Sequence, residues 1–80
     1  MIYNPKQLAN QLKLIRTQRD LTQNDLAKKV GIKQSTLSSF ETHPETTQLQ
    51  TVFKIIQALE VDFELHKKQL STVAVTDEEW

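Results

Sequence analysis

Side chains that can hydrogen-bond to the edges of nucleic-acid bases gather in residues 33–39, which read KQSTLSS. A lysine can donate to O6 and N7 of guanine, a glutamine can bind N6 and N7 of adenine, and a small hydroxyl can take either role. If the stretch is helical, these side chains lie at or near one outer face. We therefore predict that four residues read bases: Lys33, Gln34, Ser35 and Ser38.

A surface helix built only from soluble residues is the alternative interpretation of this stretch. Gln-Ser-Thr and Ser-Ser are mediocre helix formers, because hydroxyl side chains compete for the backbone hydrogen bonds of the helix. Helix propensity alone therefore does not explain these residues, and base reading is favoured. Thr36 and Ser39 are assigned a supporting role or a phosphate contact beside the base-reading residues.

The elements that must position these side chains are two short helices within residues 21–41 (LTQNDLAKKVGIKQSTLSSFE). Thr22 can cap the first helix with its hydroxyl, and Asp25 lies in the first turn, where the helix dipole favours a negative charge. Gly31 is the only glycine of the chain, and it stands where this helix must end and a left-handed backbone is readily tolerated. The spacing predicts a helix-turn-helix motif.

The composition points to one small domain. Eighty residues lie near the lower limit for a self-sufficient core, and only 38% of them are hydrophobic, so oligomerisation would be unsurprising. The chain has no cysteine, which excludes a disulfide framework and a thiolate metal site and is consistent with a reducing compartment. The apolar runs are far shorter than the roughly 20 residues that span a bilayer. We expect a soluble, cytoplasmic protein with no membrane partner.

The charge is distributed unevenly, although the formal net charge is zero. Residues 1–41 carry seven lysines and arginines against three acidic residues, whereas residues 77–80 carry three carboxylate side chains and end in Trp80. A basic half suits a nucleic-acid backbone, for which the distribution of charge matters more than its sum. The separation suggests two different partners.

A further helix is expected on each side of the motif. Asn4 can cap the first one and Pro5 can begin it, and its basic residues, Arg16 among them, are assigned to the exposed face. Residues 41–47 (ETHPETT) indicate a loop, after which Thr47 is expected to cap the last helix in a capping box with Gln50.

The last helix has the strongest apolar stripe in the chain, and Ile55 lies beside this stripe. The stripe consists of Leu49, Val52, Phe53, Ile56 and Leu59.

Residues 60–66 change to a repeat of two, which is typical of a half-buried strand. Val61, Phe63 and Leu65 alternate with polar residues, and no second convincing strand exists in the sequence. A single strand leaves its backbone groups unpaired. We expect it to pair with the same strand of a second chain across a two-fold axis. The alternative is a solitary extended segment lying on the core.

The last part of the chain is expected to be a flexible acidic tail, residues 68–80. Its only aromatic residue, Trp80, could stand there by chance. Alternatively, it is an anchor that enters a pocket of a partner protein and orders on binding.

Residues 4–60 resemble the Xre/Cro family of helix-turn-helix regulators. More narrowly, the chain is similar over nearly its full length to the HipB-type antitoxins of HipA-type toxin–antitoxin pairs. The resemblance is carried by PKQLANQLKLIR, by the helix-turn-helix stretch, by TVFKIIQALEV and by the acidic end that finishes in Trp80.

The resemblance implies a homodimer with an intermolecular two-stranded sheet, which binds a palindromic operator upstream of the pair's own genes. It implies a serine/threonine kinase toxin, bound away from the active site, that receives the terminal Trp80. By position it implies the same four base-reading residues, and a Gln23 that contacts phosphate and braces Gln34. Lys28 and Lys29 are further candidates for phosphate contacts.

Two other functions compete with this interpretation. A stand-alone Xre-family or phage-type regulator would have no toxin partner. An enzyme is disfavoured, because two histidines in unrelated contexts, no cysteine and no glycine-rich loop leave no catalytic, metal or cofactor site. We predict a mainly α fold, with a four- to five-helix Cro/C1-type domain over residues 1–60 and a dimerisation strand over 61–67.

Overall fold

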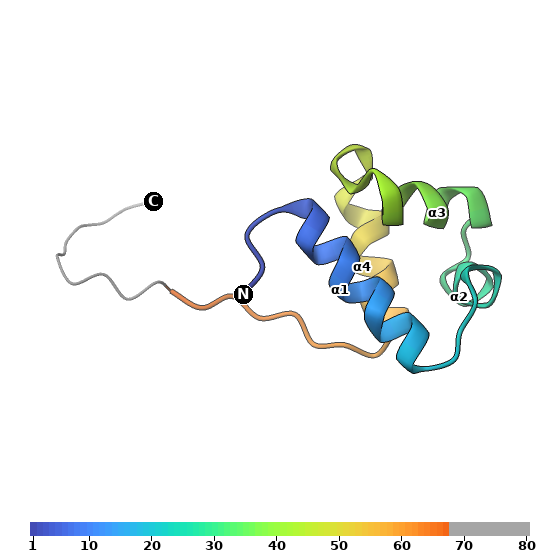
Figure 1. Ribbon diagram of the computed structural model, residues 1–80, viewed down its shortest axis with the longest axis horizontal. Coiled ribbons are helices and arrows are strands. Elements are labelled where there is room, and N and C mark those ends of the chain that lie inside the picture. Colours follow the sequence, from blue (N-terminus) through green and yellow to red (C-terminus); the bar gives the residue numbers. More distant parts are fainter. Residues whose placement is uncertain (68–80) are drawn as a thin grey trace, which may run out of the picture.

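Helices dominate the computed structural model, which describes residues 1–67 (Figure 1). Its elements in chain order are α1 (Pro5–Gln18), α2 (Gln23–Val30), α3 (Gln34–Thr42), a short 3-10 helix η1 (Pro44–Thr46) and α4 (Leu49–Ala58). The mainly α prediction and its helix-turn-helix motif are confirmed.

Two helices begin at the residues that the sequence indicates. The Asn4 side chain accepts a hydrogen bond from the backbone N–H of Gln7 at 2.8 Å, and Pro5 follows as the first helical residue. At α2 the Thr22 hydroxyl accepts from the backbone N–H of Asp25 at 3.0 Å, while the Asp25 carboxylate accepts from the Thr22 N–H at 3.1 Å. These caps satisfy N–H groups that a helix start leaves unpaired.

Three helices end in a left-handed residue. Gly31 has a φ of +87° after α2, as its position in the sequence indicates. Asp20 after α1 and Glu60 after α4 both have a φ of +58°, in a region that side chains other than glycine rarely adopt. The next residue then returns its N–H to the helix, as Val61 does to the Ile56 carbonyl at 3.2 Å. Each chain reversal is therefore hydrogen-bonded.

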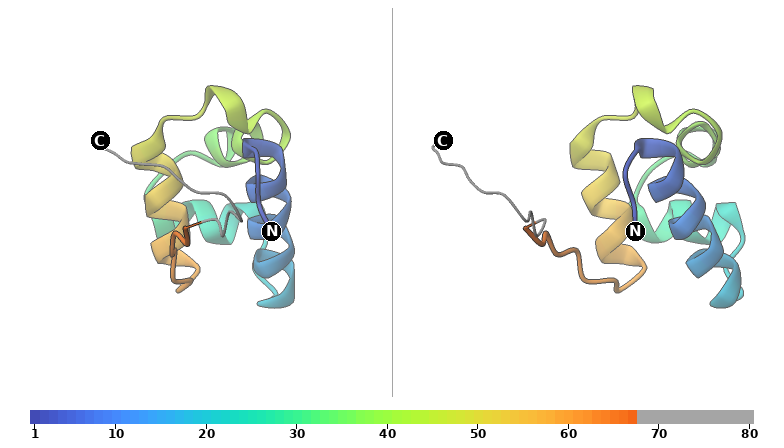
Figure 2. Two further views of the ribbon diagram at one scale, coloured as in Figure 1. Left: turned by 90° about the vertical axis from the view of Figure 1, so that its left-hand side faces the viewer. Right: turned by 60° about the vertical axis from the view of Figure 1, so that its left-hand side comes forward.

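The core lies between the four helices. The helix α2 packs on α3 and α4, and α1 packs on α3, so the motif rests on the two flanking helices (Figures 1 and 2). The buried apolar residues come from all four: Ala9, Leu12, Leu26, Ala27, Leu37, Phe40, Val52, Ile55, Ile56 and Leu59.

The predictions for residues 41–50 are wrong in two respects. The stretch 41–47 is not a simple loop, because Glu41 and Thr42 continue α3 and η1 follows. Thr47 does not cap α4 either. Its N–H donates to the Pro44 carbonyl at 3.0 Å, which closes η1, and Gln48 becomes the residue before α4 without a side-chain hydrogen bond to the helix. The turn after Pro44 uses the residues that a capping box would need.

The stripe of α4 is rotated from the prediction. Ile55 is fully buried in the core, whereas Leu49 is 70% and Phe53 is 40% exposed. Ile55 belongs to the same buried cluster as Leu26 and Ala27 of α2, the helix against which α4 packs. Leu49 instead lines an open groove of about 1400 Å³ that lies between α1, α4 and the chain after α4.

Residues 61–67 follow α4 and extend away from the helices (Figures 1 and 2). Within the single described chain they form no hydrogen-bonded strand. The Phe63 ring meets the Phe53 ring of α4 edge to face, with centroids 5.5 Å apart. A strand that pairs with a second chain needs that chain, so the pairing stays a prediction. The predictions for residues 68–80 and Trp80 lie outside the described residues.

Candidate nucleic-acid interface

The predicted base-reading residues lie in the first turns of α3. Lys33 precedes the helix, and Lys33, Gln34 and Ser35 are all exposed. Ser38 follows one turn later and is half-buried. The first turn has no side-chain cap, so its polar side chains are not used to close the helix. The structure brings these residues together at one end of α3.

The supporting residues divide between α3 and α2. Thr36 is half-buried and Ser39 is exposed on α3, while Lys28 and Lys29 are exposed in the last turn of α2. Two lysines at a helix C-terminus complement the negative end of the helix dipole.

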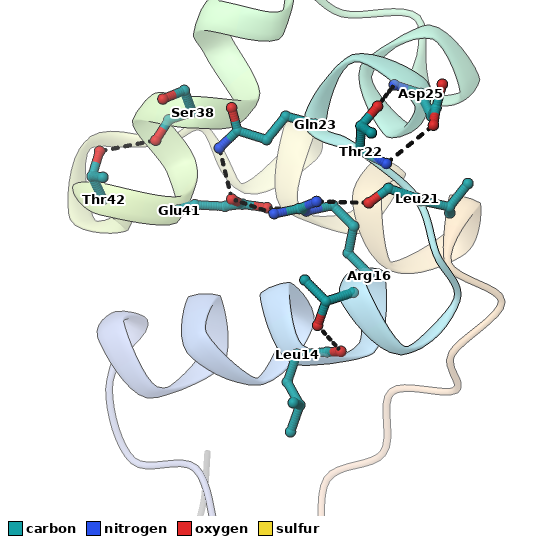
Figure 3. A network of polar contacts seen from close by, with 10 residues as sticks. Leu14, Arg16, Leu21, Thr22, Gln23, Asp25, Ser38, Glu41 and Thr42 are labelled. Carbon is teal, nitrogen blue, oxygen red and sulfur yellow. Dashed lines mark hydrogen bonds and ion pairs between the residues drawn. The ribbon is translucent and has the colours of Figure 1, made fainter.

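The other end of α3 is anchored by a buried ion pair, which Figure 3 shows. The Arg16 guanidinium of α1 donates from Nε to Glu41 Oε2 at 2.8 Å and from Nη2 to Glu41 Oε1 at 3.3 Å. Its Nη1 donates to the backbone carbonyl of Leu21 at 2.6 Å, before α2 begins. The side chains of Arg16 and Glu41 are only 9% and 3% exposed. One guanidinium therefore connects α1, the α1–α2 turn and α3.

Gln23 joins the same network from the first residue of α2. Its side-chain Nε2 donates to Glu41 Oε1 at 2.9 Å. The hydrogen bond that Gln23 makes is thus to the C-terminal end of α3, and not to Gln34 at the start of that helix. The start of α2 and the end of α3 are fixed to each other through a carboxylate that is itself neutralised.

The predicted exposed position of Arg16 is wrong, and the structural role of Glu41 was not predicted from the sequence. Arg16 lies four residues after the buried Leu12, and Glu41 lies four residues after the buried Leu37. Both charges therefore stand on the inward stripe of their helices, because residues four apart share a helix face. Opposite charges on two inward stripes are the signal that could have predicted this pair.

A second contact holds the end of α3 to α1. The Lys6 ammonium donates to the backbone carbonyl of Thr42 at 3.1 Å, and the Thr42 hydroxyl donates to the Ser38 carbonyl at 2.9 Å. Carbonyl groups at the C-terminal end of a helix have no partner within the helix, and the positive charge of a lysine there interacts favourably with the helix dipole.

The start of α2 also shifts the titration of one carboxyl. The backbone N–H of Thr22, and then its hydroxyl, lower the pKa of Asp25 below its ordinary value of 3.8, and Lys28 lowers it further. Asp25 is therefore charged at neutral pH, where it favours the N-terminus of α2.

Among the described residues, no group of three or more histidine, cysteine or acidic side chains is placed to hold a metal ion. The histidines lie in exposed pairs, His43 with Glu45 at 3.8 Å and His66 with Glu64 at 3.2 Å. No helix in residues 1–67 has the length and apolar character to cross a membrane.

Comparison with known proteins gives a consistent result. Residues 12–66 match the family described as Helix-turn-helix. The chain is 56% identical over 64 residues to Antitoxin HipB of Escherichia coli K12, covering 80% of this chain and 73% of that protein. Antitoxin HipB of Escherichia coli O6:H1 is also 56% identical, and the match covers 68% of it.

Solved structures of similar sequence have the same fold. The "HipA-HipB-O2-O3 complex" contains a chain that superposes with a TM-score of 0.82 at 52% identity, covering 86% of this chain and 97% of that one. The "HipB-O4 20mer complex" gives a TM-score of 0.81 at 52% identity and the same coverage. These identities and coverages show that the chain belongs to the HipB-type antitoxins of the helix-turn-helix family.

Proposed function

We propose that the protein is a DNA-binding antitoxin, which binds a palindromic operator as a dimer, represses its own operon and complexes a HipA-type serine/threonine kinase. The observation that carries the proposal is the arrangement of α3. Its C-terminal end is fixed in the fold by the buried Arg16–Glu41 pair, and its N-terminal end presents Lys33, Gln34 and Ser35 to solvent.

The mechanism for DNA is major-groove reading by the exposed end of α3. The groove admits an α-helix, and the N-terminal residues of a recognition helix are those that contact base edges. Gln34 and Ser38 are four residues apart and so share one helix face. Lys28 and Lys29 of α2, with Gln23, Thr36 and Ser39, would contact phosphates or support α3. Such contacts give affinity without sequence preference.

A second copy of the chain is supported by the apolar groove between α1, α4 and residues 61–67. Leu49 on its wall is 70% exposed and Leu65 is 86% exposed, although both are large apolar side chains. Val61, Phe63 and Leu65 would pair with the partner's residues 61–67 as an antiparallel sheet and cover the groove. The dimer would place two α3 helices about 34 Å apart, which is one turn of DNA, or a multiple of it.

The kinase part of the proposal is supported by the relative whose solved complex contains HipA together with HipB. The sequence adds Trp80 after three carboxylates, a segment suited to an aromatic anchor. If a kinase-like protein is encoded beside this gene, its co-purification with this protein, with and without Trp80, tests this part of the proposal. Equal recovery of both forms would contradict the anchor, and no kinase-like neighbour would favour a stand-alone regulator.

Fluorescence anisotropy with a duplex from upstream of the protein's own gene tests DNA reading. Gln34→Ala should weaken binding by about 1–3 kcal/mol, which is roughly 5- to 150-fold, at the cognate duplex and much less at a random one. Gln57→Ala is the matched control, because Gln57 is an exposed glutamine of α4 outside the interface. Unchanged affinity after both Lys33→Ala and Gln34→Ala would overturn the assignment.

A further inference from the structure

The carboxylate of Glu41 accepts hydrogen bonds from the buried Arg16 and from the half-buried Gln23. Arg16 holds both of its oxygens, at 2.8 Å and 3.3 Å, and the side chain is 3% exposed, so the carboxylate is held in place. One of the same oxygens also accepts from Nε2 of Gln23 at 2.9 Å. Gln23 is half-buried at the start of α2, next to solvent.

This contact determines which way the amide of Gln23 faces. A glutamine amide has an acceptor end and a donor end, and it can turn about its last bond to exchange them. A carboxylate accepts hydrogen bonds and does not donate them, so only the orientation with the nitrogen toward Glu41 is favourable. The oxygen of Gln23 points away from Glu41 (Figure 3). One amide N–H remains for another acceptor.

We propose that Glu41 is a positioning residue of the DNA interface, which holds the Gln23 amide in one orientation so that its remaining N–H donates to a DNA phosphate. This proposal rests on the proposed DNA-binding function. The start of α2 suits an anion, because the helix dipole is positive there. Glu41 does not repel the phosphate strongly, because Arg16 neutralises it at 2.8 Å.

The variant Glu41→Gln tests the orientation of the Gln23 amide while it keeps the size of the side chain at position 41. Arg16 would keep its Nε hydrogen bond to the single oxygen of the new side chain, and the new NH2 group would stand opposite both Nε2 of Gln23 and Nη2 of Arg16. Two donors then face each other, and the Gln23 amide turns around. The result is a loss of the held orientation with little change in side-chain volume.

The experiment is a double-mutant cycle of Glu41→Gln and Gln23→Met, measured by anisotropy with the upstream duplex and a random duplex of equal length. Gln23→Met keeps the size of the side chain and removes the donor, and should weaken both duplexes about tenfold, the worth of a hydrogen bond to a charged group. Glu41→Gln should weaken both about three- to tenfold in the wild-type background, and have no effect beside Gln23→Met.

The salt dependence distinguishes this contact from a cationic one. A neutral amide releases no counterion, so Gln23→Met should keep the wild-type slope of affinity against salt, whereas Lys29→Ala should flatten it if Lys29 contacts phosphate. A merely structural role of Glu41 would lower affinity equally with and without the Gln23 amide, and that result would overturn the proposal.

Two further readouts keep the proposal testable if Glu41→Gln does not fold. Wild-type affinity in Gln23→Met would overturn it without any change at Glu41. Side-chain amide signals of Gln23 in the NMR spectrum that exchange with water as fast as those of the exposed Gln57 would overturn it as well. If the wild type binds neither duplex, the proposed function itself fails. If it binds and the Gln23 variants match it, only the positioning role fails.

Discussion

Removing the carboxylate of Glu41 should destabilise the fold far more than a typical substitution. In Glu41→Ala the guanidinium of Arg16 stays in a site where its side chain is 9% exposed, without the acceptor that takes two of its hydrogen bonds. Breaking a buried pair from one side costs about 3–5 kcal/mol, because the remaining charge is buried and uncompensated. The amide of Gln23 loses its partner too.

The size of this loss can be set against the whole fold. Eighty residues at roughly 0.05–0.15 kcal/mol each give a free energy of unfolding of about 4–12 kcal/mol. The loss is therefore a large part of the total, and at the lowest end of that range it unfolds the domain. In a domain of this size each kcal/mol shifts Tm by about 4–8 °C, so 3 kcal/mol corresponds to roughly 12–24 °C.

The assay is urea unfolding followed by circular dichroism, at one protein concentration because dimerisation adds to apparent stability. Arg16→Met/Glu41→Leu is the informative partner variant. It removes both charges at similar volume and should be more stable than Glu41→Ala by at least about 2 kcal/mol, since apolar replacements of buried pairs are often neutral. A loss below about 1 kcal/mol in Glu41→Ala, or a double variant as unstable as the two singles combined, would refute the reasoning.

Other predictions concern single residues. Gly31→Ala should cost about 1–2 kcal/mol in unfolding experiments although open space surrounds the new methyl group, because the φ of +87° alone opposes it. Asp20→Gly should show the opposite sign and stabilise by about 0.5–1 kcal/mol, because it relieves a φ of +58°. The lowered pKa of Asp25, caused first by the backbone N–H of Thr22, contributes stability that is present above pH 3.8 and lost as the pH falls through the folded value; Asp25→Asn should therefore flatten the decline of Tm at acid pH. Phe63→Ala removes an edge-to-face contact at 5.5 Å and should raise the dimer dissociation constant in sedimentation equilibrium, whereas unchanged association would contradict the role of residues 61–67.

Local signals predict three of the helix boundaries. The caps at Asn4 and Thr22 and the turn at Gly31 depend on a few neighbouring residues, so the sequence contains all that is needed. The start of α4 was harder to predict. Thr47 and Gln50 form a capping-box pattern, but a tight 3-10 turn after Pro44 competes for the same backbone and prevails.

Contacts between residues that are far apart in the sequence could not be predicted from local sequence patterns. Arg16 was assigned to solvent because a charge is rarely buried without a partner, and its partner Glu41 is 25 residues away. Phe53 belongs to the predicted apolar stripe of α4 but is 40% exposed, because periodicity does not say which neighbour each side of the helix meets. The base-reading residues were easier to propose, since exposed polar side chains on a helix start need no partner within the chain.

The two ends of α3 have separate roles. Stability depends on Glu41 at one end, whereas Lys33, Gln34 and Ser35 at the other end make no side-chain hydrogen bond within the described part of the chain. If these three residues read bases as proposed, their substitution changes the recognised operator with little effect on folding. Related antitoxins would then diverge in their DNA targets one side chain at a time, and duplicated toxin–antitoxin pairs in one genome would become independent in their regulation.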